Sequence, residues 1–301
     1  MDNIKILLIG CGYWGRNWFK TIRDSKHSLV GVVDPSPSVP VVNTPLFSSI
    51  EDVNVEYTHA IIAVPAQFHA QCKSKLKIPD ENILVEKPCG LNLDDSASMG
   101  NIYPGFLFLH SPQYKQIKSN LKEIGEPIGY HSRRCSMGPR IRTDVSIIED
   151  YLVHDLYMFT DLFGSQNMQG VKLMRNNFKA PILSDEICVF LEREKLMANM
   201  FSSWWYPVKT RSVVIIGTKG SFVWENDKVS LTFSSYHETP GETDVHGNHG
   251  YNLIESSMAE LDTYNKKSNL ELELDAFVEK NKPFSDTLLS DTWNLIRKIK
   301  A

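Results

Sequence analysis

A lysine and a glutamate stand together at the end of an apolar run in the first third of the chain. The run 83–85 is followed directly by Glu86, Lys87 and Pro88. Ligands of open α/β sheets collect at the carboxyl ends of strands. A lysine there could hydrogen-bond a substrate hydroxyl or relay a proton, because burial and a neighbouring carboxylate tune its pKa. A Glu-Lys pair is also a common surface ion pair, so these residues alone leave both interpretations open.

An aspartate and a histidine share one face of a predicted helix. Asp150 and His154 are four residues apart within 145–162, a segment with a helical apolar period, and positions i and i+4 project from the same side. Histidine suits proton transfer near neutrality, and an aspartate one turn earlier could orient it or contact a substrate. The same pair could also be a capping or surface pair, so it predicts chemistry only together with other motifs.

A glycine-rich turn near the N-terminus has the pattern GxGxxG. Its residues are Gly10, Cys11, Gly12, Tyr13, Trp14 and Gly15. The first glycine permits a tight turn, the second lets the backbone approach a pyrophosphate, and the third lets helix and strand pack closely. The N-terminus of the following helix offers free N–H groups to phosphates. Because a buried-strand run precedes the turn and a helical segment follows it, we predict a dinucleotide site.

An acidic residue closes the second apolar run, 29–33. Asp34 follows Gly15 by roughly the 20 residues expected of the acid that hydrogen-bonds the adenosine ribose. A carboxylate here would repel a 2′-phosphate, and no Arg or Lys occurs within 35–42 to neutralise one. We therefore expect NAD(H) to be favoured over NADP(H).

The elements that must position these residues fall into two groups. In the first half, apolar runs alternate with helical segments, which predicts a parallel sheet covered on both faces. The expected strands are 4–9, 29–33, 59–64 and 82–85, and the expected helices are 14–23 and 67–77. The stretch Pro35–Pro45 carries four prolines, so we expect a loop or a single turn where a crossover helix normally lies.

The second half has a different pattern, in which apolar segments follow one another with few helices between them. Such strands are most simply antiparallel. The expected strands are 187–192, 196–204, 212–216, 221–224 and 229–233, and the expected helices are 111–121, 145–162, 270–280 and 288–300. We predict an α/β protein in which 1–109 form a Rossmann domain with a doubly wound parallel sheet. Residues 110–301 are expected to form an α+β domain with an open, mostly antiparallel sheet.

Composition limits the kinds of partner and the compartment. The 301 residues carry a formal net charge of −4, so nothing indicates a nucleic-acid or anionic-membrane partner. No run approaches the ~18 apolar residues of a membrane span, and the N-terminus lacks the features of a signal peptide. Five scattered cysteines are typical of reduced thiols. We expect a cytoplasmic protein.

Several motifs together resemble the glucose–fructose oxidoreductase, inositol dehydrogenase and MocA family (Gfo/Idh/MocA). They are GCGYWG in the glycine turn, AVPAQFH at Ala63–His69, EKP at Glu86–Pro88, and the segments Gly138–Leu156 and Ser202–Trp224. They occur in the family's order along nearly the whole chain. The resemblance implies a Rossmann domain followed by an open-faced antiparallel sheet, with 110–301 serving substrate binding and oligomerisation. It also implies an NAD(P)-dependent dehydrogenase acting on CH–OH groups.

The resemblance also implies roles for individual residues. Lys87, Asp150 and His154 would surround the carbon that exchanges a hydride with nicotinamide. We expect His154 to be the general base, Lys87 to position the hydroxyl, and Asp150 to orient the histidine or bind substrate. Which of Lys87 and His154 accepts the proton stays open. Tyr157 stands where many relatives carry an aspartate, and this chain has Asp155 instead, as do members acting on nucleotide-linked or otherwise polar sugars.

The cofactor contacts that follow from the turn and the resemblance lie at the ends of four predicted strands. They are Gly10, Gly12, Tyr13, Trp14, Gly15, Asp34, Val64, Pro65, His69, Glu86 and Lys87. We expect His69 to support the cofactor side of the site structurally, not to act as a catalyst.

Weaker features concern the second domain. Lys209 and Arg211 could reach an anionic substrate group or play a plain sheet-edge role. The loop 244–249 has metal-ligand residue types, but hydride transfer to NAD needs no metal, and we predict no metal site. Relatives associate through the open face of the sheet, so we expect a homodimer or homotetramer.

The predicted function is hydride transfer between nicotinamide and a secondary hydroxyl or keto group of a sugar, cyclitol or nucleotide-sugar. One alternative is an NAD-dependent glycosidase, which would release a free sugar without net NADH. Another is a dinucleotide-binding sensor that has lost its chemistry, and the intact set of Lys87, Asp150 and His154 argues against it.

Overall fold

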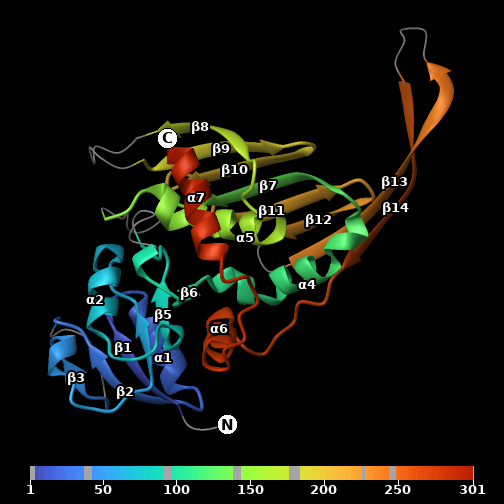
Figure 1. Cartoon of the computed structure of the whole chain (residues 1–301). Coiled ribbons are helices and arrows are strands. Elements are labelled where there is room, and N and C mark those ends of the chain that lie inside the picture. The colour runs from blue at the N-terminus through green and yellow to red at the C-terminus, as the bar shows by residue number, and fades with distance from the viewer. Residues whose placement is uncertain are drawn as a thin grey trace.

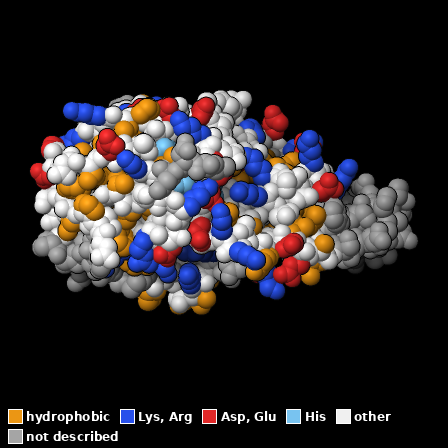
Figure 2. All heavy atoms as spheres, turned by 90° about the horizontal axis from the view of Figure 1, so that it is seen from below, with side chains coloured by type: hydrophobic (Ala, Val, Ile, Leu, Met, Phe, Trp, Pro, Cys, Tyr) orange, Lys and Arg blue, Asp and Glu red, His pale blue; other side chains and the backbone are white. Residues whose placement is uncertain are grey.

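Two β-sheets form the frame of the molecule, one from each half of the chain (Figure 1). The computed structural model describes residues 4–36, 43–90, 97–137, 144–175, 184–225, 228–243 and 249–300. On the face seen from below, basic and acidic side chains are intermixed (Figure 2).

The first sheet is parallel throughout and runs in the order β3-β2-β1-β4-β5-β6. Its strands are β1 (Lys5–Ile9), β2 (Ser28–Val33), β3 (Leu46–Phe47), β4 (His59–Ile62), β5 (Ile83–Glu86) and β6 (Tyr103–Gly105). The reversal of strand order between β1 and β4 is the crevice at which such sheets bind dinucleotides. The predicted strands at 4–9, 29–33, 59–64 and 82–85 are therefore confirmed.

Helices cover both faces of this sheet, as predicted. Alternate residues of β1 point to opposite faces. Ile6 and Leu8 pack with Trp18 of α1 (Gly15–Arg23), whereas Leu7 packs with residues of α2 (His69–Lys75). Burial on both sides explains why β1 is a continuous apolar run. Short 3₁₀ turns complete this half: η1 (Ile50–Asp52), η2 (Ala66–Phe68) and η3 (Asp80–Asn82). Most of the expected loop at Pro35–Pro45 lies outside the described residues.

A helical connection leads from β6 to the second sheet. It consists of η4 (Leu107–His110), α4 (Pro112–Asn120) and η5 (Leu121–Ile124). The Ser111 hydroxyl caps α4 by accepting the N–H of Tyr114 at 3.1 Å, and Pro112 occupies the first turn, where its missing N–H costs nothing.

The second sheet has the order β14-β13-β12-β11-β7-β10-β9-β8. Its strands are β7 (Pro127–Cys135), β8 (Gln169–Arg175), β9 (Glu186–Arg193), β10 (Leu196–Ser203), β11 (Thr210–Gly217), β12 (Gly220–Glu225), β13 (Lys228–Thr243) and β14 (His249–Glu260). All neighbouring pairs are antiparallel except β7 and β10. The predicted mostly antiparallel sheet is confirmed, although β7, β8 and β14 were not predicted.

The central strand β7 escaped prediction because its buried face is polar. Ser132 and Arg134 are buried beside Tyr130, so no apolar alternation marks the strand. β13 and β14 extend beyond the sheet as a long two-stranded ribbon (Figure 1).

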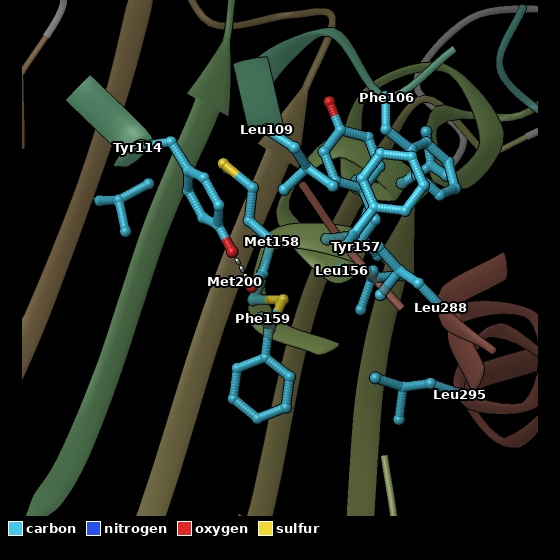
Figure 3. Close-up of a cluster of buried hydrophobic side chains, with 14 of the residues drawn as sticks. Phe106, Leu109, Tyr114, Leu156, Tyr157, Met158, Phe159, Met200, Leu288 and Leu295 are labelled. Carbon is cyan, nitrogen blue, oxygen red and sulfur yellow. Dashed lines mark hydrogen bonds between the residues drawn. The ribbon is translucent and has the colours of Figure 1, made fainter. Parts of the chain in front are cut away.

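Helices cover one face of the second sheet. α5 (Val153–Phe163) lies between the sheet and α7 (Leu288–Lys300), and its apolar residues meet Met200 of β10 in one core (Figure 3). The predicted helix 145–162 differs from the structure, since a π-helical turn, η6 (Ile148–Leu152), precedes α5.

The last part of the chain returns to the first sheet. α6 (Asn269–Val278) packs beside it, with the Phe277 ring 5.4 Å from both His59 and Tyr103. No helix among the described residues has the length and apolarity needed to cross a bilayer.

Candidate active site

The surroundings of each glycine in the N-terminal turn explain why glycine occupies that position. Gly10 has φ +88°, a conformation that favours glycine, and a Cβ on it would lie 2.8 Å from the carbonyl carbon of Ala63. A Cβ on Gly15 would lie 2.1 Å from the oxygen of Gly10. A Cβ on Gly12 would meet no atom within 4 Å, so this glycine faces open space where a phosphate could approach. The geometry agrees with the roles expected from the sequence.

The Asp34 carboxylate lies against this turn. Its Oδ2 accepts the N–H of Cys11 at 2.7 Å, and its Oδ1 accepts the N–H of Ser36 at 2.8 Å. Each carboxylate oxygen keeps a second lone pair for a ribose hydroxyl. Asp34 thus fixes the turn and presents negative charge at the position predicted to contact the adenosine ribose.

Glu86 joins the helix after the turn to the end of β5. Its Oε1 accepts from the indole of Trp18 at 2.6 Å and from the indole of Trp14, and its Oε2 accepts the N–H of Lys87 at 3.2 Å. Burial raises the pKa of the Glu86 carboxyl. Trp14 and Glu86, both expected to contact the cofactor, thus bond to each other, while Tyr13 is 83% exposed beside them.

His69 lies between two strand ends. Its ring nitrogens are 2.9 Å from the Val64 carbonyl oxygen and 3.1 Å from the Pro88 carbonyl oxygen, and the side chain is 1% exposed. Its position links the segment after β4, which includes Pro65, to the segment after β5.

Lys87 reaches from β5 to the π turn. Its Nζ donates to the Asp150 Oδ1 at 3.0 Å and to the Asp150 carbonyl oxygen at 2.7 Å. The Asp150 Oδ2 accepts from the Trp204 indole at 3.2 Å. Both partners of the ion pair are mostly buried. π-helical turns occur frequently at functional sites, and here the turn presents both a carboxylate and a carbonyl to one lysine.

His154 is the second residue of α5 and contacts the hydroxyl of Tyr157. Its Nδ1 lies 2.8 Å from the Tyr157 hydroxyl, whose oxygen also accepts the N–H of Phe108 at 3.2 Å. Burial and then the charges of Lys87, Arg134 and Arg211 lower the pKa of His154 well below its ordinary value. The imidazole is therefore neutral at physiological pH.

A buried ion pair that the sequence did not reveal lies behind the histidine. Arg134 donates to the Asp155 carboxylate through Nε at 2.9 Å and through Nη2 at 3.1 Å, and its guanidinium stacks 4.4 Å from the Phe108 ring centroid. In the sequence, this ion pair was indicated only by Asp155, which faces away from the Asp150 side of the helix. A buried aspartate there requires a cation as its partner. Lys209 and Arg211 line a cavity beside Phe108. The expected metal-type loop lies almost entirely outside the described residues.

The N-terminal part also matches a known family by sequence. Residues 4–103 fit the model of GFO_IDH_MocA, the oxidoreductase family with an NAD-binding Rossmann fold. This stretch, about a third of the chain, is therefore similar to the NAD-binding part of Gfo/Idh/MocA oxidoreductases. A search of curated proteins gave no match to the chain.

Solved structures share the fold of the whole chain. The UDP-N-acetylglucosamine 3-dehydrogenase GnnA of Acidithiobacillus ferrooxidans is 16% identical with TM-score 0.76, over 99% of this chain and 97% of that one. The WlbA dehydrogenase of Bordetella pertussis, solved with NADH and UDP-GlcNAcA, is 14% identical with TM-score 0.77, over 99% and 95%. An Agrobacterium radiobacter oxidoreductase solved with NAD⁺, L-tartaric acid and magnesium is 16% identical with TM-score 0.74, over 99% and 96%.

These matches confirm the Gfo/Idh/MocA resemblance and the predicted fold class. The bond between Trp14 and Glu86 places the glycine turn beside the end of β5, next to the crevice between β1 and β4. Residues 4–103 thus match an NAD-binding oxidoreductase family, and Lys87, which follows β5, contacts Asp150 in the π turn before the helix that carries His154.

Proposed function

We propose that this chain is an NAD(H)-dependent dehydrogenase that transfers a hydride between nicotinamide and a secondary hydroxyl or keto group of a sugar, cyclitol or nucleotide-sugar. The observation that carries the proposal is the bond from the Lys87 Nζ to Asp150, made at the end of β5 and near a neutral histidine. Two structures of the same fold are named as dehydrogenases, one for UDP-N-acetylglucosamine and one holding UDP-GlcNAcA, which supports this substrate class.

The residues of the crevice fit a bound dinucleotide. The open side of Gly12 and the N-terminus of α1 would receive the pyrophosphate, and the Asp34 carboxylate would accept from the ribose hydroxyls. NAD(H) supplies the hydride acceptor and donor. Because a 2′-phosphate would meet the carboxylate of Asp34, we propose that NAD(H) is preferred over NADP(H).

Lys87 would orient the reacting hydroxyl. An ammonium group has three donors, and Asp150 receives two of them. The third would donate to the substrate oxygen. Asp150 therefore acts mainly by fixing the direction of the lysine, and Trp204 fixes Asp150 in turn.

His154 would exchange the proton through Nε2, because Nδ1 faces Tyr157. Burial raises the pKa of Tyr157 well above its ordinary value, so the phenol keeps its proton. With Phe108 donating to the phenol oxygen, the simplest arrangement has Tyr157 donating to Nδ1, and the neutral ring then carries its proton on Nε2. In the other tautomer the ring carries its proton on Nδ1 and donates it to the Tyr157 oxygen, which leaves Nε2 free to accept a proton from an alcohol, so that the ring becomes a cation.

We also propose self-association through the second sheet. Its face opposite α5 carries exposed apolar side chains, including Val171 and Leu173 on β8, which are 69% and 70% exposed. The register places Phe190 of β9 opposite Val171, and Met197 of β10 is also exposed. A contiguous apolar patch of this kind marks an interaction site, and a second copy, as a homodimer or within a homotetramer, would cover it.

Near-ultraviolet absorbance of NADH tests the function under single-turnover conditions. Stoichiometric protein with NAD⁺ is mixed with sugars, inositols and nucleotide-sugars in turn. NADH formation with one class supports the proposal. Release of free sugar without net NADH would indicate the glycosidase reaction, and NADH binding without either reaction would indicate a sensor.

A further inference from the structure

A cavity of about 360 Å³ opens beside the candidate catalytic histidine. Phe108 belongs to its lining, and the same ring lies 5.0 Å from the His154 ring in an edge-to-face arrangement. Phe108 thus separates the histidine from the cavity by one side chain. A ligand in the cavity would lie next to the reacting end of the site.

The lining of this cavity is basic although the chain as a whole is acidic. Its described residues are Phe108, Gln113, Arg134, Lys209, Arg211, Ser212, Val213, Trp224 and Asn269. Three of them are cationic and none is acidic, whereas the chain has a formal net charge of −4. The basic character is therefore a local property of the site.

The three cations do not have the same role. Arg134 is bound to Asp155 through two hydrogen bonds, and the charge of Arg211 acts on the same carboxyl by lowering its pKa against the rise caused by burial. Arg211 and Lys209 enter the cavity from β11 and the residue before it. The charge of Arg211 also lowers the pKa of His154, which places it within electrostatic reach of the catalytic centre.

The other lining residues fit the body of a sugar. Gln113, Ser212 and Asn269 offer neutral hydrogen-bonding groups, while Trp224 and Phe108, whose ring centroids are 6.2 Å apart, offer an apolar wall. The volume lies at the small end of the roughly 300–1,000 Å³ typical of ligand sites. A monosaccharide-sized body therefore fits better than a complete dinucleotide.

We infer that Lys209 and Arg211 form a subsite for an anionic substituent, a carboxylate or a phosphate, carried by the sugar substrate. This inference rests on the proposed dehydrogenase function and narrows its substrate class to anionic sugars. A guanidinium presents a planar fork that matches either oxyanion, and a lysine adds a point charge. The anion would fix the sugar at one end while Lys87 and His154 meet its hydroxyl at the other.

Calorimetric titration of the full-length, NADH-loaded protein tests the subsite without turnover. The probes are glucuronate, glucose 1-phosphate and neutral methyl glucoside. The variants are Lys209→Gln, Arg211→Gln and Arg211→Lys, with Lys195→Gln as the matched control because Lys195 is exposed and pairs with Glu126. Thermal melting of each variant checks that it is folded.

We expect an anionic probe to bind at least about tenfold more tightly than methyl glucoside, and Lys209→Gln and Arg211→Gln each to weaken it about tenfold. Arg211→Lys should retain part of the binding, and Lys195→Gln all of it. Whichever of glucuronate and glucose 1-phosphate binds more tightly identifies the substituent as a carboxylate or a phosphate. Equal binding of all probes, binding of none, or binding unchanged in the folded variants would overturn the subsite.

The failure of the subsite and the failure of the dehydrogenase function give different results. Oxidation of an anionic sugar at a rate and KM that Lys209→Gln and Arg211→Gln leave unchanged would keep the function and remove the subsite. Anion binding that depends on both residues, with no NADH formed from any bound sugar, would keep the subsite and remove the function.

Discussion

The Nζ of Lys87 lies 3.0 Å from the Oδ1 of Asp150, and this ion pair joins two segments that are 63 residues apart in the sequence. One partner follows the last residue of β5, and the other stands in the π turn before α5. The pair thus connects the dinucleotide-binding sheet with the helix that carries His154. The ion pair thus links the cofactor side and the substrate side of the proposed site through the two side chains to which we assign roles in the reaction.

Tyr157→Phe should impair catalysis with little effect on substrate binding. The variant retains the ring stacked on Phe106 at 4.4 Å (Figure 3) but loses the hydroxyl that contacts the His154 Nδ1. We expect kcat to fall about tenfold or more, with a changed pH dependence of kcat and nearly unchanged KM. Tyr114→Phe, which removes a hydroxyl bonded to Asp161, is the control. A Tyr157→Phe enzyme with the wild-type pH profile would contradict the tautomer role.

Asp34→Ala should weaken NADH binding and narrow the preference for NADH over NADPH. Loss of hydrogen bonds to a charged group predicts a Kd for NADH that is higher by about 10- to 100-fold, and NADPH should be affected less because the repulsion of its 2′-phosphate disappears. Fluorescence titration with both cofactors measures the change, with Asp24→Ala as the control at a surface acid. Equal affinity of the wild-type protein for NADH and NADPH would contradict the cofactor proposal.

Stability should fall as pH decreases from 6.5 toward 4, in part because of His59. Burial lowers the pKa of His59 from 6.5 to about 4. The unfolded chain therefore binds a proton in this interval that the folded chain does not, and the free energy of unfolding falls as the pH falls. His59→Phe, which keeps a ring against Phe277, should flatten this part of the profile. Urea unfolding at a series of pH values measures the slope, and identical slopes would rule out the contribution of His59.

Charges on the exposed sheet face should reduce the oligomeric state. Val171→Glu combined with Leu173→Glu introduces two carboxylates on β8 where apolar side chains are 69% and 70% exposed. We expect light scattering to show a dimer or tetramer for the wild type and a monomer for the double variant. Tyr264→Glu, at an exposed residue elsewhere, should leave the mass unchanged. A monomeric wild type would refute self-association.

The parallel sheet was predictable because burial on both faces produces continuous apolar runs. This rule holds for β1, β2, β4 and β5. The glycine turn was also predictable, because a side chain on Gly10 or Gly15 would collide with neighbouring backbone atoms. The second sheet was less predictable. Its central strand β7 buries Ser132 and Arg134, so its pattern does not alternate between apolar and polar residues.

The candidate site was predictable as a set of residues but not as a set of contacts. Lys87, Asp150 and His154 were found by type and position. The π turn was not, because a hydrophobic period does not distinguish it from an α-helix. Partners from distant segments, such as Arg134 for Asp155 and Phe108 for His154, depend on strand register and helix packing. No local pattern carries that information.

If Lys87 orients the substrate hydroxyl for hydride transfer, its loss should slow the single-turnover formation of NADH. The substrate identified by the panel of sugars is mixed with NAD⁺ and a stoichiometric amount of the wild-type protein or of the Lys87→Met variant. Lys118→Met is the control, because it removes a lysine that pairs with Asp161 outside the site. We predict a rate lower by about 10² to 10⁴ in Lys87→Met, with NADH binding retained and Lys118→Met unaffected. A folded Lys87→Met protein that forms NADH at the wild-type rate would contradict the account.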